Sequence, residues 1–176
     1  AYDKIGHENC QEQILGSPGN FTASKLKWVQ QNEPEVFNKA VYMMLPGDFI
    51  AAKLSKKPQI STSGLSEAAL WNFKKGALAT EILEAMGLPE NMIPEIVSNF
   101  GFQAQVHPDI AQELGLNPNI QITYRAGDQP NNALSLNVLK PGEIATTAGT
   151  SAVIYAVSDK DIYDKQNRIN TFSHVN

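Results

Sequence analysis

Cysteine and positive charge are both scarce in this sequence. One cysteine, Cys10, occurs among 176 residues, so no disulfide can form within the chain, and a disulfide-stapled mini-protein is excluded. The 14 Lys and Arg residues are outnumbered by 18 Asp and Glu residues, which gives a formal net charge of −4. Because nucleic-acid binding depends on clusters of Lys and Arg that neutralise phosphates, we expect no nucleic-acid partner.

Long apolar runs are also missing. The most apolar stretches, residues 50–52 and 151–157, are far shorter than the roughly 20 residues that span a bilayer, so we expect no membrane partner. The single unpaired cysteine indicates a reducing compartment and hence a cytoplasmic location. With 42% hydrophobic and 18% charged residues, the chain can bury a core of ordinary domain size.

The first half of the sequence predicts mainly helices. One amphipathic segment predicts a helix that Thr22 could cap and that Pro34 cannot continue. The run 41–45 is β-like, and Pro46 then suits the first turn of another helix. Apolar positions between residues 77 and 86 follow helical spacing as well, and Gly87 supplies the positive-φ residue that commonly ends such a helix.

The second half alternates short strands with helices. It predicts a short helix over residues 109–114 and a half-buried strand over 120–124. Two further strands are expected over 143–148 and 152–157, on either side of a tight turn at 149–151. This mixture of helices and strands is typical of the α/β class.

Asp128 is the strongest candidate for chemistry. It follows Gly127 at the end of a predicted strand and precedes a helical segment, which places it where open α/β folds bind ligands. An ionised carboxylate there could accept a hydroxyl proton, and the amide of Gln129 could bind polyol hydroxyls. The alternative, which spacing alone favours, is that Asp128 only caps the helix.

The turn formed by Gly149, Thr150 and Ser151 is the second candidate. Its consecutive backbone N–H groups, together with the Thr and Ser hydroxyls, could hold phosphate oxygens. The segment lacks the Gly-Lys-Ser/Thr of a Walker loop, and a plain hairpin turn is the alternative.

The three histidines offer no metal site. His7, His107 and His174 are scattered and have no cysteine or carboxylate at metal-ligand spacing. We therefore assign no metal ligand to this chain.

Four motifs in a fixed order resemble one enzyme family. They occupy residues 22–34, 44–50, 127–133 and 148–151. Their order is that of the FGGY carbohydrate kinases, and within this family the chain looks most like the xylulose kinases. The resemblance extends over nearly all 176 residues.

The resemblance implies an actin/hexokinase-like architecture, in which two ribonuclease H-like α/β domains face each other across a cleft. Residues 1–138 would form the latter part of the N-terminal sugar-binding domain, and residues 139–176 would form the opening strands of the C-terminal ATP-binding domain. No Asp-x-Gly-Thr phosphate loop is found in the sequence, so we expect an internal fragment that is inactive in isolation. The full-length enzyme could form a homodimer.

The resemblance also implies roles for the candidate residues. Asp128 would be the catalytic base for the sugar hydroxyl, and Gln129 would contact sugar hydroxyls. Gly149, Thr150 and Ser151 would contact the phosphates of ATP, with Mg²⁺ neutralising charge. The implied reaction is ATP-dependent phosphorylation of a sugar, with D-xylulose as the first choice and D-xylulose 5-phosphate as its product.

Two other functions stay open at this point. One is a kinase for another acceptor, such as glycerol, gluconate or another ketose. The other is a non-catalytic module that keeps the two loops in order to bind a sugar or a nucleotide.

Overall fold

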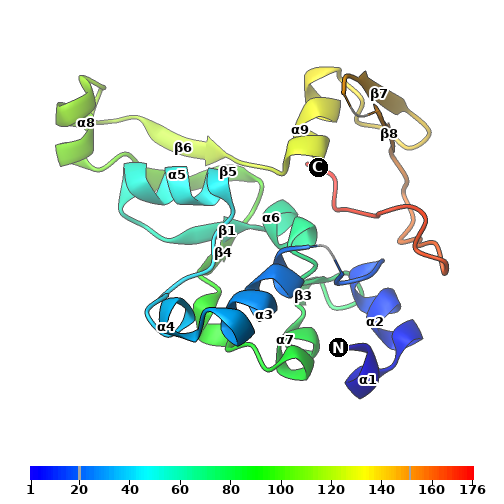
Figure 1. Ribbon diagram of the computed structural model, residues 1–176. Coiled ribbons are helices and arrows are strands. Elements are labelled where there is room, and N and C mark those ends of the chain that lie inside the picture. Colours follow the sequence, from blue (N-terminus) through cyan, green and yellow to red (C-terminus); the bar gives the residue numbers. More distant parts are fainter. Residues whose placement is uncertain (20, 151) are drawn as a thin grey trace.

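The computed structural model describes residues 1–19, 21–150 and 152–176. Helices and strands are mixed along most of this length, which confirms the α/β expectation in its general form (Figure 1). The described elements are, in chain order, α1 (Tyr2–Ile5), α2 (His7–Ile14), α3 (Thr22–Asn32), α4 (Pro34–Phe37), α5 (Pro46–Ser55), β1 (Gln59–Ser61), α6 (Thr62–Glu67), β2 (Trp71–Asn72), β3 (Ala77–Leu78), α7 (Thr80–Met86), the 3₁₀ helix η1 (Glu90–Met92), β4 (Glu95–Val97), β5 (Phe100–Gln105), α8 (Pro108–Leu114), β6 (Gln121–Tyr124), α9 (Asp128–Ser135), β7 (Ile144–Ala148) and β8 (Ala152–Ala156).

The strands pair two by two. β1 and β4 are parallel, with Ile60 opposite Ile96, and the segment between them carries α6 and α7. β2 pairs with β3 and β5 pairs with β6, in both cases antiparallel. β7 and β8 form an antiparallel hairpin beside α9, at the opposite end of the molecule from α8 (Figure 1).

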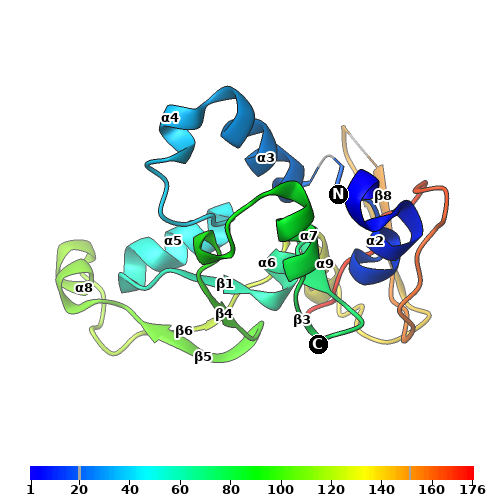
Figure 2. The ribbon, with the colours of Figure 1, turned by 90° about the horizontal axis from the view of Figure 1, so that it is seen from below.

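The main hydrophobic core surrounds β1, α6 and α7. Ile60, Leu65 and Ile82 from these elements are all 0% exposed. Residues from α2 and α3, including the free Cys10 and Ala23, belong to the same core. The N-terminal helices therefore form part of the same packed unit as the β1–β4 pair (Figure 2).

Several predicted elements are present nearly as expected. α5 begins at Pro46, and α7 ends before Gly87, which has the positive φ of 63° that the sequence indicated. α8 and β6 cover most of the segments predicted over residues 109–114 and 120–124.

Other local predictions are wrong. Thr22 does not cap α3, because the helix begins at Thr22 itself and Phe21 holds the N-cap position without a side-chain hydrogen bond. The run 41–45 is not a strand: its Met43 N–H donates a hydrogen bond to the Met92 carbonyl at 2.8 Å, without forming a ladder. Met43 is buried, but Val41 and Tyr42 are 68% and 43% exposed, so the hydrophobic character of this run reflects neither sheet pairing nor burial along its length.

The C-terminal segment returns to α6. The Asn99 side chain accepts a hydrogen bond from the Ser63 N–H at 3.0 Å and donates one to the Val175 carbonyl at 3.1 Å. The Ser173 N–H donates to the Ser66 hydroxyl at 2.8 Å. These bonds place the end of the chain against the helix that also borders the main cavity.

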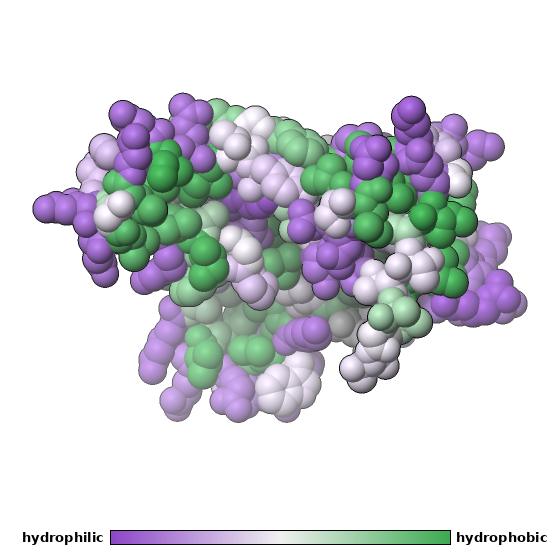
Figure 3. Space-filling model, turned by 90° about the horizontal axis from the view of Figure 1, so that it is seen from above, coloured by the Kyte–Doolittle hydropathy of each residue, from purple (hydrophilic) through white to green (hydrophobic). Residues whose placement is uncertain are grey.

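The surface is hollowed near the middle of the face seen in Figure 3, and hydrophilic residues gather there. Hydrophobic side chains reach the surface on both sides of this hollow (Figure 3). Within the described part of the chain, none of the helices has the length and apolar character needed to cross a membrane.

Replacing Ile60 tests the position of the core. Ile60→Ala should lower the free energy of unfolding by about 2–5 kcal/mol, because the removed methyl groups leave a cavity in a fully buried strand. The matched control is Ile154→Ala, since Ile154 on β8 is 75% exposed and its loss should change stability little. Urea unfolding measures both variants, and equal losses would contradict the assigned core.

Candidate active site

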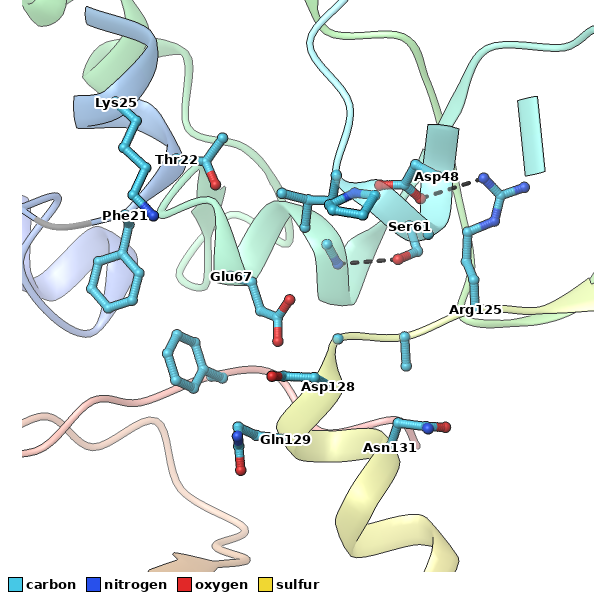
Figure 4. A pocket seen from close by; sticks show the side chains of 17 residues that line it. Phe21, Thr22, Lys25, Asp48, Ser61, Glu67, Arg125, Asp128, Gln129 and Asn131 are labelled. Atoms are coloured by element: carbon cyan, nitrogen blue, oxygen red, sulfur yellow. Dashed lines mark hydrogen bonds and ion pairs between the residues drawn. The ribbon is translucent and has the colours of Figure 1, made fainter. Parts of the chain in front are cut away.

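A cavity of about 500 Å³ lies between α3, α5, α6 and the start of α9. Figure 4 shows its side chains from close by. The residues that line it are Phe21, Thr22, Lys25, Leu45, Pro46, Gly47, Asp48, Ser61, Gly64, Glu67, Arg125, Ala126, Gly127, Asp128, Gln129, Asn131 and Phe172. Segments distant in the sequence thus contribute both apolar and polar side chains to one cavity.

Asp128 is the first residue of α9 and is exposed to this cavity. Gly127 holds the N-cap position, and no side chain makes a capping hydrogen bond there. The alternative that the Asp128 side chain caps the helix is therefore wrong. Its carboxylate faces the cavity, next to the positive end of the helix dipole.

One face of α6 packs against Gly127. Ser63 and Glu67 are four residues apart in the helix and therefore lie on the same side of it. The Ser63 hydroxyl accepts a hydrogen bond from the Gly127 N–H at 2.9 Å. A Cβ atom at position 127 would lie only 1.9 Å from Oε1 of Glu67, so any side chain there would displace the Glu67 carboxyl from its position against α9.

The Glu67 and Asp128 side chains lie next to one another where α6 meets the start of α9 (Figure 4). Burial raises the pKa of the Glu67 carboxyl to about 7, and the negative charge of Asp128 adds to this shift. The backbone N–H of Asp128 favours the ionised form of Glu67 and partly offsets the two effects. Glu67 can therefore change its protonation state near neutral pH.

Arg125 lies on the opposite wall in a buried polar network. It is 8% exposed, and its Nη1 donates to Asp48 Oδ1 at 3.4 Å and to the Gln59 carbonyl at 3.2 Å. Its Nη2 donates to Gln59 Oε1 at 3.2 Å, and its Nε donates to Gln103 Oε1 at 2.9 Å. Burial raises the pKa of Asp48, and the charge of Arg125 partly offsets that increase.

The remaining predicted site residues are divided between two places. Gln129 lines the cavity beside Asp128. Gly149 and Thr150 are exposed at the end of the β7–β8 hairpin and do not line that cavity. Ser151 lies outside the described residues, so the phosphate-binding role of this turn stays a prediction, as does the domain boundary at residue 138.

Sequence reasoning did not identify Glu67 or Arg125 as parts of the site. The four-residue spacing of Ser63 and Glu67 was a usable signal, because it places two polar groups on one face of a short helix. Nothing in the sequence could indicate that Arg125 contacts Asp48, since these residues come from separate elements.

No metal-binding cluster is found in the part of the chain that the structure describes. Those residues contain no group of three or more His, Cys, Asp or Glu side chains that could hold an ion. Because Mg²⁺ in phosphoryl-transfer enzymes is usually bound through substrate phosphates and one or two carboxylates, we derive no catalytic step from a metal held by this chain alone.

Comparisons with known proteins assign this chain to one family. Residues 5–135 match the model of the N-terminal domain of the FGGY family of carbohydrate kinases. A xylulose kinase of Klebsiella pneumoniae is 27% identical over 179 residues, which cover 98% of this chain and 35% of that relative. The chain thus spans about a third of the length of this curated relative.

Solved structures agree with this assignment at the level of the fold. A xylulose kinase from Rhodospirillum rubrum superposes with a TM-score of 0.89 and 18% identity, over 98% of this chain and 35% of that one. A Plasmodium falciparum glycerol kinase with ADP gives a TM-score of 0.75 and 22% identity, over 86% of this chain and 31% of that one.

The chain is a mixed α/β segment with an actin-like ATPase fold, and a cavity lies at one of its strand-to-helix junctions. The chain belongs to the FGGY family of carbohydrate kinases and corresponds to part of their N-terminal domain.

The buried charge network gives a test of the cavity wall. Arg125→Met should lower the free energy of unfolding by about 3–5 kcal/mol, because it leaves Asp48 buried without its cation. Arg168→Met is the matched control, since Arg168 pairs with Asp164 at the surface and should contribute far less. Urea unfolding at neutral pH measures both variants. A loss for Arg125→Met no greater than that of the control would show that the network is not a stabilising feature.

Proposed function

We propose that this chain is part of an enzyme that transfers the γ-phosphoryl group of ATP to a sugar hydroxyl, with D-xylulose as acceptor and D-xylulose 5-phosphate as product. The observation that carries the proposal is the Asp128 carboxylate, which is exposed to the cavity and does not serve as a helix cap. The chain that carries it belongs to a family of carbohydrate kinases. The sugar is the finer part of the proposal, and the similarity to a xylulose kinase supports it.

Asp128 acts as the general base in this proposal. Phosphoryl transfer passes through a loose transition state, so alignment of the acceptor oxygen and stabilisation of charge supply most of the rate enhancement. The Asp128 carboxylate orients the attacking hydroxyl group and accepts its proton as the bond to phosphorus forms. Exposure of Asp128 to the cavity supports this role, because a base must reach the hydroxyl directly.

The cavity has a size and composition suited to a small polyol. Its volume of about 500 Å³ is within the range of small-molecule sites. Gln129 and Asn131 offer amide donors and acceptors, and Thr22 and Lys25 add a hydroxyl and an ammonium group from α3. These groups would bind sugar hydroxyls while Asp128 faces the one that reacts.

The nucleotide is proposed to bind nearer the β7–β8 hairpin, where Gly149, Thr150 and Ser151 would contact its phosphates and Mg²⁺ would arrive with them. Because Gly149 and Thr150 do not line the cavity of Asp128, transfer requires that the two regions approach each other. We propose that the 176 residues alone do not catalyse the reaction, and that the complete enzyme could form a homodimer.

Another acceptor is the second candidate. The similarity to a glycerol kinase structure favours a test of glycerol alongside the ketose. Gluconate belongs in the same panel, because the polar groups of the cavity suit polyols in general.

Replacing the base tests the proposed chemistry in the complete kinase that carries this chain. Asp128→Asn should lower kcat for D-xylulose by about 10²–10⁴-fold, because the amide cannot accept the hydroxyl proton. The melting temperature should change little, since Asp128 is exposed. Coupled ADP-release assays with D-xylulose, glycerol and gluconate measure both the loss and the preferred acceptor.

Asp161→Asn provides the matched control, because Asp161 is exposed in a loop away from the cavity. Its kcat should equal that of the wild type. Near-normal turnover of Asp128→Asn would remove Asp128 from the role of base.

A further inference from the structure

Two side chains of α6 contact the residue that precedes α9. The Ser63 hydroxyl accepts a hydrogen bond from the Gly127 N–H at 2.9 Å. The Glu67 carboxyl occupies the space that a side chain at position 127 would need. The two groups belong to one helical face and reach the same residue. The residue that follows is Asp128, so α6 fixes the point from which that side chain projects.

We propose that Glu67 is a positioning residue for Asp128: held against Gly127 by α6, its carboxyl group orients the carboxylate that receives the sugar proton. This inference rests on the proposed function, because it assigns Glu67 a part in the same reaction. Glu67 acts through Asp128 and does not exchange a proton with the substrate. The hydroxyl proton passes to Asp128, and Glu67 keeps the same protonation state throughout the transfer.

The acidic neighbours of Glu67 favour its protonated form. Asp128 on α9 and Asp48 on α5 both place negative charge near it, while Arg125 is directed to Asp48. None of the ion pairs found among the described residues includes Glu67. A protonated Glu67 can donate its hydrogen to the Asp128 carboxylate, whereas two ionised carboxylates would repel each other.

The other titratable neighbours come from α3, β8 and the C-terminal segment. Lys25 lines the same cavity. Tyr155 senses the charge of Glu67, which, together with burial as the larger cause, raises the pKa of the Tyr155 hydroxyl to about 12. The Tyr155 hydroxyl and His174 Nδ1 are 2.9 Å apart, and burial lowers the pKa of His174. Tyr155 and His174 are thus neutral at pH 7, and the cations among the residues that line the cavity are Lys25 and Arg125.

The consequence is a pH-dependent orientation of the base. Glu67 keeps its proton below pH 7 and loses it as the pH rises through its pKa of about 7. The hydrogen bond to Asp128 is then replaced by repulsion. A part of the wild-type kcat should therefore be lost above pH 7, in addition to any change caused by the substrates.

Two replacements of Glu67 separate positioning from packing. In the complete kinase, Glu67→Gln keeps a hydrogen-bond donor at every pH, so its kcat at pH 6.5 should equal that of the wild type and the loss above pH 7 should disappear. Glu67→Ala removes the group that orients Asp128 and should lower kcat by up to about 100-fold, with a smaller change in KM.

Glu113→Gln is the matched control, because Glu113 is also near the end of a short helix, α8, but is exposed and distant from the cavity. It should leave kcat and its pH profile unchanged. This inference would be overturned if both Glu67 variants kept the kcat and the pH profile of the wild type while Asp128→Asn was inactive. That result would leave the proposed function intact. A wild-type enzyme that phosphorylates no sugar would overturn both.

A measurement on the 176-residue chain tests the carboxyl pair without catalysis. In ¹³C-labelled protein, the Glu67 carboxyl signal should titrate near pH 7, and its midpoint should fall in Asp128→Asn, because the neighbouring charge is gone. A midpoint near the ordinary 4.5 in both proteins would show that the two groups do not interact, and would overturn the inference even if a Glu67 variant folded poorly.

Discussion

The close packing of α6 on Gly127 is the constraint on which the site depends. The Ser63 hydroxyl accepts the Gly127 N–H, and the Glu67 carboxyl lies where any Cβ atom at position 127 would collide. The glycine leaves room for the Glu67 carboxyl and does not serve a positive φ, since its φ is −64°. α9 begins at the next residue, so this contact lies directly beside Asp128.

Two carboxyl groups that line the cavity, the buried Asp48 and the half-buried Glu67, differ in their electrostatic surroundings. Asp48 has a cationic partner in Arg125, whose remaining donors are bound by Gln59 and Gln103. Glu67 has no such partner among the described residues, and its pKa rises accordingly. Asp48 is thus paired with a cation, whereas Glu67 tends to keep its proton. Of the two, Glu67 is the one next to Asp128.

Local chemistry in the sequence was sufficient to predict much of the fold. Pro46 at a helix start and Gly87 at a helix end act through their own backbone restrictions, so their effects do not depend on distant residues. The run 41–45 was misread because β propensity reflects burial and pairing, and no strand lies next to this run among the described residues. The family itself was recognisable because its motifs occur in order over most of the chain, and the matched residues 5–135 confirm it.

The site was only partly predictable. Asp128 and Gln129 follow from a strand-to-helix junction that is local in sequence, and both line the cavity. Glu67 and Arg125 reach that cavity through tertiary contacts, which single-sequence periodicity does not report. Their roles depend on burial and on the charges around them, and those properties exist only in the folded chain.

The central claim is that Asp128, oriented by α6, is the base for a sugar hydroxyl. A crystal structure of the complete kinase with D-xylulose and a non-hydrolysable ATP analogue tests it most directly. We expect an Asp128 carboxylate oxygen within about 2.6–3.2 Å of the hydroxyl oxygen that faces the γ-phosphate, with the Glu67 carboxyl in contact with the other Asp128 oxygen. A reacting hydroxyl bound to a different side chain, with Asp128 directed to solvent, would contradict it.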